Sequence, residues 1–368
     1  MMQIVENPNI MGKKVADQLV ETICGAGIRH IYAVTGDSLN EVNDAVRRAG
    51  TVRWIHMRHE ESGAFAAAAE AQLNGLACCA GSSGPGHVHL INGLYDAHRS
   101  NCSVLAIAST CPSDQFGTGY FQETSPIRLF DDCSGYNQMA VTPVQFARML
   151  PAALQHALHK REVAVIGLPG DVAACPCAES PGAPGPLPSH SIFRPQDGEL
   201  RQLADMIASA ERITLFCGIG AREAHDEVVQ LAGLLKAPVA YSFKSKMEVQ
   251  YDNPFEIGMT GLLGLPSAYG SMHESDLLIL LGTDFPYDSF LPQECRIVQV
   301  DIRPERIGRR ARVELGLAGD VKDTLQALLP MLKEHTDRSF LDRQLKIYRE
   351  LCDDMAVVAS KPGGIGNL

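Results

Sequence analysis

Short apolar runs alternate with amphipathic segments through the first half of the chain. Apolar residues at helical spacing over 13–26 precede a β-branched and aromatic run at 31–34, and the alternation then repeats. Asp37 or Ser38 is expected to cap the second helix. The expected strands are 31–34, 54–57, 76–81, 103–108 and 163–168, and the expected helices are 13–26, 39–48, 60–73, 87–100 and 145–158. This alternation predicts βαβ units and a parallel sheet with helices on both faces.

A second series of the same kind follows a proline-rich break. Residues 175–196 hold six prolines and no usable periodicity, which is typical of an interdomain linker. Beyond it we expect strands at 213–217, 238–241, 277–281 and 297–302, and helices at 198–209, 222–235, 321–333 and 339–359. The pattern predicts an α/β protein with two consecutive domains, each a mainly parallel sheet with helices on both faces. The domains are placed at 11–174 and 197–335, followed at 336–368 by a C-terminal helix and the start of a connector.

Composition excludes several classes of function. The 368 residues carry 43 acidic and 32 basic side chains, and the formal net charge of −11 offers no footprint for nucleic acid. No apolar run is long enough to span a bilayer, and no signal-peptide pattern stands at the N-terminus. The eleven cysteines lack zinc-site spacing and suit buried thiols in a reducing compartment. We therefore expect a cytoplasmic protein that does not bind nucleic acid.

Titratable residues gather at 56–61, where an expected strand meets a helix with the sequence His-Met-Arg-His-Glu-Glu. This spacing fits neither zinc-protease motif, so no metal is expected there. Glu61 is explained by the favourable field of a helix N-terminus. Glu60 opens an alanine-rich helix that indicates an apolar setting, where a carboxyl group can share a proton with a ligand nitrogen. Three further histidines are expected to be ordinary helix-face residues: His87, His89 and His98.

Three other patterns each allow a plain structural interpretation beside a functional one. The Ser-Ser-Gly-Pro-Gly turn at 82–86 would let a ligand approach a helix N-terminus, but many α/β turns look alike. Gly218 and Gly220 begin a dinucleotide-binding pattern whose third glycine position holds Glu223. Asp301, at the end of an apolar strand, could bind a ribose hydroxyl or cap the turn that follows it.

Longer motifs recur in a fixed order over nearly the whole chain. They are VTGDSLN (34–40), RHEESGAFAAAAEAQL (58–73), GSSGPGHVHLINGLYDAHR (81–99), GYFQE (119–123), LPGDVA (168–173), YDNPFEIGMTGLLG (251–264), LLGTDFPY (280–287) and DIRPERIG (301–308). Together these segments resemble thiamine-diphosphate enzymes of the pyruvate oxidase and acetolactate synthase type, and most closely the pyruvate:quinone oxidoreductases. The resemblance implies a pyrimidine-binding domain followed by a central FAD-binding, Rossmann-like domain.

The resemblance also implies roles for matching positions. Glu60 would be the catalytic residue that hydrogen-bonds the aminopyrimidine ring of thiamine diphosphate. Further residues of the pyrimidine side would be Thr35, Gly36, Ser83, Pro85 and His89, and the substrate side would hold Phe121 and Gln122. FAD would contact Gly218, Gly220, Thr260, Gly261, Gly282, Thr283, Phe285, Asp301, Ile302 and Asp320. No metal ligand is implied within this chain.

One family feature is missing from this sequence. The third domain of the family carries a Gly-Asp-Gly motif that holds Mg²⁺ and the diphosphate, and the nearest string here is Gly319-Asp320-Val321. The resemblance therefore implies the N-terminal two-thirds of an enzyme that oxidises pyruvate to acetate and CO₂ and passes electrons through FAD to a quinone. With an incomplete thiamine-diphosphate site, the chain is expected to be inactive alone.

Two alternatives stay open at this point: an acetolactate synthase-like carboligase, and a non-catalytic remnant that binds FAD or regulates a partner. The resemblance implies a homodimer or homotetramer, with a separate chain as one source of the third domain. It also implies peripheral attachment to the inner membrane in a full-length form.

Overall fold

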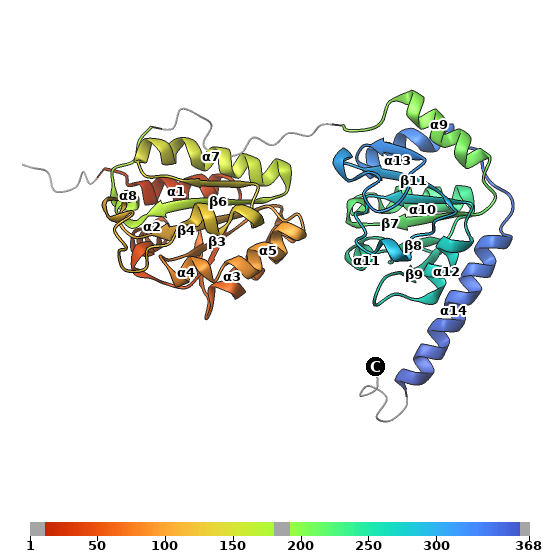
Figure 1. Ribbon diagram of the computed structural model, residues 1–368, viewed down its shortest axis with the longest axis horizontal. Coiled ribbons are helices and arrows are strands. Elements are labelled where there is room, and N and C mark those ends of the chain that lie inside the picture. The colour runs from red at the N-terminus through yellow and green to blue at the C-terminus, as the bar shows by residue number, and fades with distance from the viewer. Residues whose placement is uncertain (1–11, 180–191, 361–368) are drawn as a thin grey trace, which may run out of the picture. The chain divides into compact units, whose positions relative to one another are not determined.

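The protein is described by a computed structural model over residues 12–179 and 192–360 (Figure 1). Its chain divides into two compact units, Met1–Ser189 and His190–Leu368. Each unit is built around a six-stranded sheet whose neighbouring strands are all parallel. Helices cover both faces of each sheet, so the predicted fold class is confirmed.

The first sheet has the strand order β2-β1-β3-β4-β6-β5. Its strands are β1 (His30–Ala33), β2 (Arg53–His56), β3 (Ala77–Gly81), β4 (Val104–Thr110), β5 (Tyr136–Met139) and β6 (Val163–Pro169). The five predicted strands all exist, with their ends shifted by at most two residues. Strand β5 was not predicted, because its residues Tyr-Asn-Gln-Met are mostly polar and lie at the sheet edge without full burial.

Two apolar cores lie on opposite faces of the first sheet. One face is covered by α1 (Val15–Gly25), α2 (Asn40–Ala49), α7 (Pro143–Lys160) and α8 (Gly170–Ala174), and the other by α3 (Glu60–Asn74) and α5 (Ile91–Arg99). In β4, Leu105 and Ile107 belong to the first core, whereas Val104 and Ala106 belong to the second. This burial on both faces explains why the central strands are continuous apolar runs in the sequence.

The helix expected at 87–100 is divided in the structure. It consists of α4 (Pro85–Val88) and α5, with a break at His89 and Leu90. At the break, Leu90 N donates to His87 O at 3.2 Å, a tighter turn than that of an α-helix. His87 itself is fully buried and hydrogen-bonds through Nδ1 with Ser109 O at 2.8 Å. The short helix α4 is therefore fixed to the end of β4 by a buried polar contact, which periodicity alone does not reveal.

The predicted cap of the second helix is also wrong. Residues Asp37–Leu39 form a 3₁₀ turn, and α2 follows at Asn40 without a side-chain cap. Ser38 is unavailable as a cap because its Oγ accepts a hydrogen bond from Ser83 N at 2.9 Å. The serine thus joins the turn after β1 to the turn after β3.

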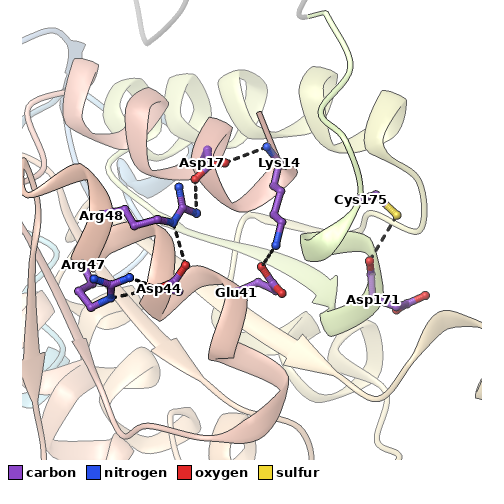
Figure 2. A network of polar contacts seen from close by, with 8 residues as sticks. All are labelled: Lys14, Asp17, Glu41, Asp44, Arg47, Arg48, Asp171 and Cys175. Carbon is purple, nitrogen blue, oxygen red and sulfur yellow. Dashed lines mark hydrogen bonds and ion pairs between the residues drawn. The ribbon is translucent and has the colours of Figure 1, made fainter. Parts of the chain in front are cut away.

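Ion pairs join α1 to α2 on the surface of the first unit (Figure 2). Lys14 Nζ lies 2.8 Å from Glu41, and Arg48 lies 2.6 Å from Asp17 and 2.7 Å from Asp44. These side chains are partly exposed, so each pair contributes little to stability on its own.

The segment after α8 packs back on the start of α1. Val15 N donates to Cys175 O, and Cys177 N donates to Lys13 O. Residues 175–179 of the predicted linker therefore contact the first unit, and residues 180–191 lie outside the described part of the chain. Figure 2 shows the neighbouring thiol of Cys175, which donates to Asp171 O at 3.3 Å.

The second sheet has the order β12-β11-β10-β7-β8-β9. Its strands are β7 (Ile213–Cys217), β8 (Val239–Tyr241), β9 (Glu256–Met259), β10 (Leu277–Leu281), β11 (Arg296–Asp301) and β12 (Leu315–Ala318). Counted from the opposite edge, this is the 3-2-1-4-5-6 order of dinucleotide-binding folds. The two edge strands β9 and β12 were not predicted, because each is four residues long and contains a glycine.

Helices again cover both faces of the second sheet (Figure 1). One face packs against α9 (Asp197–Ala208), α10 (His225–Leu235) and α13 (Val321–Leu328), and the other against α12 (Pro266–Glu274) and α14 (Ser339–Ala359). Two short helices, α6 (Pro126–Leu129) in the first unit and α11 (Lys246–Val249) in the second, complete the set. Among the described helices, none combines the length and apolar character needed to cross a membrane.

Candidate functional site

The first sheet reverses its strand order between β1 and β3, at the point where open α/β sheets bind ligands. Thr35 and Gly36 follow β1, and Ser82 and Ser83 follow β3. A Cβ on Gly36 would lie 2.4 Å from Ser82 Cβ, so the two turns touch. Glycine is therefore required at position 36 by packing, and the predicted residues of both turns share one edge of the sheet.

Glu60 begins α3 at the same carboxyl edge, after β2. The residue is 8% exposed, and its Oε2 lies 3.1 Å from His89 Nδ1. His59 caps the helix, because its Nδ1 accepts a hydrogen bond from Glu61 N, and its ring stacks on that of His89 with 4.4 Å between centroids. The structure thus brings together two predicted residues, Glu60 from the start of α3 and His89 from the break between α4 and α5.

The segment that contains Gln122 packs on the turn after β3. Ser83 Oγ donates to Gln122 Oε1 at 3.1 Å, and a Cβ on Gly84 would lie 2.7 Å from Gln122 Cβ. Gln122 itself has a left-handed φ of 59°, and Gly84 has a φ of 63°. Phe121 is 74% exposed beside it. The two residues predicted for the substrate side therefore adjoin Ser83.

A cavity of about 260 Å³ adjoins these residues and is lined in part by Ser83, Thr110, Cys111, Phe121 and Gln122. Burial raises the pKa of the Cys111 thiol, which keeps this cysteine protonated and a poor nucleophile. A larger hollow of about 520 Å³ lies along α1 and α7, away from these strand ends. The smaller cavity is the better site because it contains residues from both turns of the switch point.

Other predicted positions at this edge have less informative surroundings. Thr35 and Pro85 are exposed. His87 is a buried structural residue, not a helix-face residue, and its ring Nε2 contacts the Thr124 hydroxyl. Burial lowers the pKa of His87, which favours the neutral ring.

The residues predicted to contact FAD all lie at or just beyond the carboxyl edge of the second sheet. Gly218 and Gly220 follow β7, Thr260 and Gly261 follow β9, Gly282, Thr283 and Phe285 follow β10, Asp301 ends β11, Ile302 follows it, and Asp320 follows β12. Parallel strands end at one edge, so the topology gathers residues that are up to about a hundred positions apart in the chain.

Glycines at this edge are required by close packing of two turns. A Cβ on Gly218 would lie 2.4 Å from Gly282 O, and a Cβ on Gly220 would lie 2.7 Å from Gly282 Cα. Gly282 has a positive φ of 62°. The plain structural interpretation of the Gly218–Gly220 pattern is therefore sufficient, and contact with a dinucleotide stays a prediction.

Thr260 and Phe285 have surroundings that suit a ligand. Thr260 is 4% exposed, and its Oγ1 is buried without a hydrogen-bond partner among the described residues. Such an orphaned hydroxyl is unusual in a folded protein and calls for a partner. A Cβ on Gly261 would lie 3.4 Å from the Phe285 ring, which packs edge-on against Phe216 at 5.1 Å between centroids.

Both acidic residues predicted for FAD already have structural partners. Asp301 is 5% exposed and its Oδ1 accepts from Arg303 N at 2.9 Å, while burial raises the pKa of its carboxyl group. Asp320 caps α13 by accepting from Asp323 N at 3.2 Å. Ile302, by contrast, is 53% exposed. The hydrogen bond from Arg303 N shows that Asp301 caps the turn that follows it, as the structural interpretation expects. Its Oδ2 is then the atom that could contact a ligand.

A cluster of arginines next to this edge was not predicted from the sequence. Arg306, Arg309 and Arg310 surround Asp284, with nitrogen-to-oxygen distances of 3.9, 3.5 and 3.8 Å. Five arginines between 303 and 312 in an otherwise acidic chain were the available signal. This cluster places positive charge beside the residues predicted for a cofactor that carries phosphates.

Two family models match the chain. Residues 13–129 match the description "Thiamine pyrophosphate enzyme, N-terminal TPP binding domain", and residues 200–328 match "Thiamine pyrophosphate enzyme, central domain". The two matched ranges fall in the first and second compact units, respectively.

Curated relatives agree with these models. An uncharacterized 42.6 kDa protein of Pseudomonas amyloderamosa is 50% identical over 92% of this chain and 86% of its own length. A putative thiamine pyrophosphate-containing protein, YdaP of Bacillus subtilis, is 35% identical over 90% of the chain and 58% of its own length. The pyruvate oxidase of Lactiplantibacillus plantarum is 29% identical over 84% of the chain and 52% of its own length. Acetolactate synthases are also among the relatives, and the chain spans about half of their length.

Proposed function

This chain belongs to the thiamine pyrophosphate enzymes, and on that premise we propose that it provides the thiamine- and FAD-binding parts of a pyruvate:quinone oxidoreductase. In the proposed reaction pyruvate, water and a quinone become acetate, CO₂ and a quinol. The observation that carries the proposal is the placement of Glu60, which is buried at the switch point of the first sheet with its carboxylate beside His89.

The surroundings of Glu60 fit the aminopyrimidine ring of thiamine diphosphate. A Cβ on residue 86 would lie 2.5 Å from Ser82 Oγ and 3.5 Å from Glu60 Oε1, so glycine at this position leaves room beside the carboxylate. Thr35, Gly36 and Ser83 belong to the two turns that frame this space. These residues would hold the ring, and when bound the thiazolium supplies the electron sink for decarboxylation of a 2-keto acid.

Glu60 would hold a proton at its carboxylate and share it with a ring nitrogen. Its side chain is only 10% exposed, so little water competes for that hydrogen bond. The hydrogen bond between His89 Nδ1 and Glu60 Oε2 fixes the orientation of the carboxylate. It leaves Glu60 Oε1 facing the space beside Gly86. Gln122, held by Ser83, would orient the substrate on the adjoining cavity wall.

The second unit fits a flavin nucleotide in part. The buried Thr260 hydroxyl lacks a partner that a ligand could supply, and Asp301 and the nearby arginines suit ribose and phosphate groups. FAD would supply a two-electron acceptor there. Asp320, in contrast, is engaged as a helix cap, so its role in binding FAD is the least supported of the set.

The same helix cap bears on Mg²⁺. The string Gly319-Asp320-Val321 is the nearest to the metal-binding motif, yet Asp320 Oδ1 accepts from Asp323 N and a Cβ on Gly319 would lie 2.7 Å from Pro195 Cδ. This segment does not fit a magnesium–diphosphate site. We therefore assign Mg²⁺ and diphosphate binding to a third domain, on the remainder of a longer polypeptide or on a separate chain in a dimer or tetramer.

An acetolactate synthase-like carboligase is the second candidate, because acetolactate synthases match the chain at a similar level to pyruvate oxidase. A non-catalytic flavin-binding subunit is the third. The quinone acceptor, a cytoplasmic location and attachment to the inner membrane belong to the proposal alone.

Two measurements test the proposed function. The purified chain is titrated with FAD while flavin fluorescence is followed, and Thr260→Val serves as the variant that lacks the orphaned hydroxyl. The chain is then mixed with the third domain of a pyruvate oxidase, and pyruvate-dependent reduction of a quinone analogue is measured. Flavin binding with quinone reduction supports the proposal. Acetolactate as the main product would favour the carboligase, and flavin binding without turnover of pyruvate would favour the non-catalytic subunit.

A further inference from the structure

Glu123 follows directly after the two residues predicted for the substrate side, and its carboxylate binds the backbone of the same loop. This loop, residues 111–125, joins β4 to α6. Its carboxylate Oε1 accepts a hydrogen bond from Gly117 N at 2.6 Å, and Oε2 accepts from Gly119 N at 2.9 Å and from Tyr120 N at 3.2 Å. The two glycines have φ angles of 81° and 72°. Such left-handed positions let neighbouring N–H groups converge on one anion.

Phe121 and Gln122 occupy the centre of a turn that closes on Glu123. The N–H of Glu123 donates to Tyr120 O at 2.9 Å. Gln122, the third residue of this turn, has a left-handed φ of 59°, a conformation that turns usually assign to glycine or asparagine. A residue keeps such an unfavourable backbone conformation only where its surroundings hold it. Here Ser83 Oγ holds the side chain of Gln122, and the carboxylate of Glu123 holds the loop.

Rigid elements hold both ends of the 111–125 loop. Ser113 N and Oγ donate to the two carboxylate oxygens of Asp171, at 2.9 and 2.6 Å. At the other end, the Thr124 hydroxyl contacts Nε2 of the buried His87. These anchors leave the middle of the loop, residues 117–121, exposed and organised from within the loop.

The charge of Glu123 strengthens the bonds that organise the loop. Hydrogen bonds from N–H groups to an ionised carboxylate are shorter and stronger than bonds between neutral groups. The bond from Gly117 N lowers the pKa of Glu123, so the carboxylate is ionised at neutral pH. A glutamine at this position would have nearly the same shape, but no charge and only one acceptor oxygen.

We propose that Glu123 is a positioning residue, which fixes Phe121 and Gln122 as a firm wall against a small 2-keto acid. Phe121 is 74% exposed and lines the cavity of about 260 Å³ together with Gln122, so its place depends on the loop more than on packing around its ring. A pocket distinguishes one extra methylene by about 10-fold or more, which requires a wall that does not yield. The substrate class rests on the proposed function, whereas the positioning of the two side chains does not.

The positioning is tested on the chain without cofactors. Phenylalanine is replaced by 4-fluorophenylalanine throughout, and Phe121→Leu identifies the fluorine resonance of that residue. We expect Glu123→Gln to move or split this resonance and to speed amide exchange in a peptide covering 113–123 by about 10-fold or more, because bonds to a charged acceptor are lost. The other fluorine resonances serve as the check on folding.

Asp114→Asn is the matched control, because it removes an exposed charge from the same loop and leaves the backbone donors to Glu123 in place. An unmoved Phe121 resonance with unchanged exchange in Glu123→Gln, or an equal change in Asp114→Asn, would overturn the positioning role.

The role toward substrate is tested in enzyme completed with a third domain. Glu123→Gln should raise the KM for pyruvate by about 10-fold with a smaller change in kcat, and lower the preference for pyruvate over 2-oxobutanoate, which carries one more methylene. Asp114→Asn should match wild type. Unaltered KM and preference in a variant whose Phe121 resonance has moved would overturn the substrate role. Absence of turnover in the wild-type enzyme would instead overturn the proposed function, and the fluorine spectrum would still decide whether Glu123 holds the two residues.

Discussion

The two parallel sheets of this protein share one architecture but present different chemistry at their carboxyl ends. The switch point of the first sheet carries a buried carboxylate in contact with an imidazole, Glu60 and His89. At the switch point of the second, between β7 and β10, three glycines pack against each other. Asp284 follows these glycines in the turn after β10 and is surrounded by arginines, and Asp301 ends the next strand, β11.

This difference indicates a division of labour. Proton transfer needs a titratable group held at hydrogen-bonding distance, and Glu60 beside His89 provides one at the switch point of the first sheet. Binding of a long nucleotide needs hydroxyls, backbone amides and positive charge spread along an edge, which the second sheet provides. On the proposed function, the same topology would serve chemistry in one unit and nucleotide binding in the other.

The largest expected effect follows from replacing the carboxylate of the first unit. In enzyme completed with a third domain, Glu60→Gln should slow pyruvate turnover by about 100- to 10,000-fold, the range for loss of a positioned proton donor or acceptor. Flavin affinity should stay unchanged, because the residues proposed to bind flavin belong to the second unit. Exchange of the thiazolium C2 proton gives the direct readout. Unchanged exchange in the variant would remove Glu60 from proton transfer and end the contrast between the units.

The next effect tests the packed glycines of the second unit. Gly218→Ala would place a Cβ 2.4 Å from a backbone oxygen, and overpacking of this kind destabilises a domain by about 1–3 kcal/mol. Gly270→Ala is the control, because no described atom lies within 4 Å of its added Cβ, and alanine favours a helix interior by up to about 1 kcal/mol. Urea unfolding should therefore shift in opposite directions for the two variants. Equal shifts would contradict the packing explanation.

The central strands and most helices were predictable because apolar burial on both faces leaves a strong signal in sequence. The strands β5, β9 and β12 were missed, since edge strands are short and partly polar. At the candidate site, Glu60 stood out as a carboxylate at the head of an alanine-rich helix. Its contact with His89 could not be derived from spacing, because it depends on how α3 packs beside the break after α4. The arginines around Asp284 were visible in the sequence, but their common partner was not.

The pH dependence of the two units should differ in sign. Burial lowers the pKa of His87, so its contribution to stability is present above the unfolded value of about 6.5 and is lost as pH falls below it. Burial raises the pKa of Asp301, so its contribution is present below about 3.9 and is lost as pH rises through the folded value. Acidification from neutral pH should therefore weaken the first unit and spare or strengthen the second.

Hydrogen exchange of peptides from α4 and β11 measures the two units separately, between pH 7.5 and pH 5.5 for the first unit and between pH 7.5 and about pH 4 for the second. His87→Gln should flatten the dependence of the first unit, and Asp301→Asn that of the second, because each variant removes the titrating group while it keeps hydrogen-bonding capacity. A parallel response of both peptides in the wild-type protein would show that these two residues do not control acid stability.

The smallest expected effect concerns the ion pairs between α1 and α2 (Figure 2). Lys14→Met removes the ion pair with Glu41, in which the Lys14 side chain is 23% exposed and the Glu41 side chain 31%. The loss should lower the stability of the first unit by less than about 1 kcal/mol. Screening weakens such pairs, so the difference from wild type should shrink between low and high salt. Val144→Thr, at a position that is 55% exposed on α7, gives a surface control without a charge change. A loss that persists in high salt would mean that packing of the lysine stem against the helices, and not its charge, provides the stability.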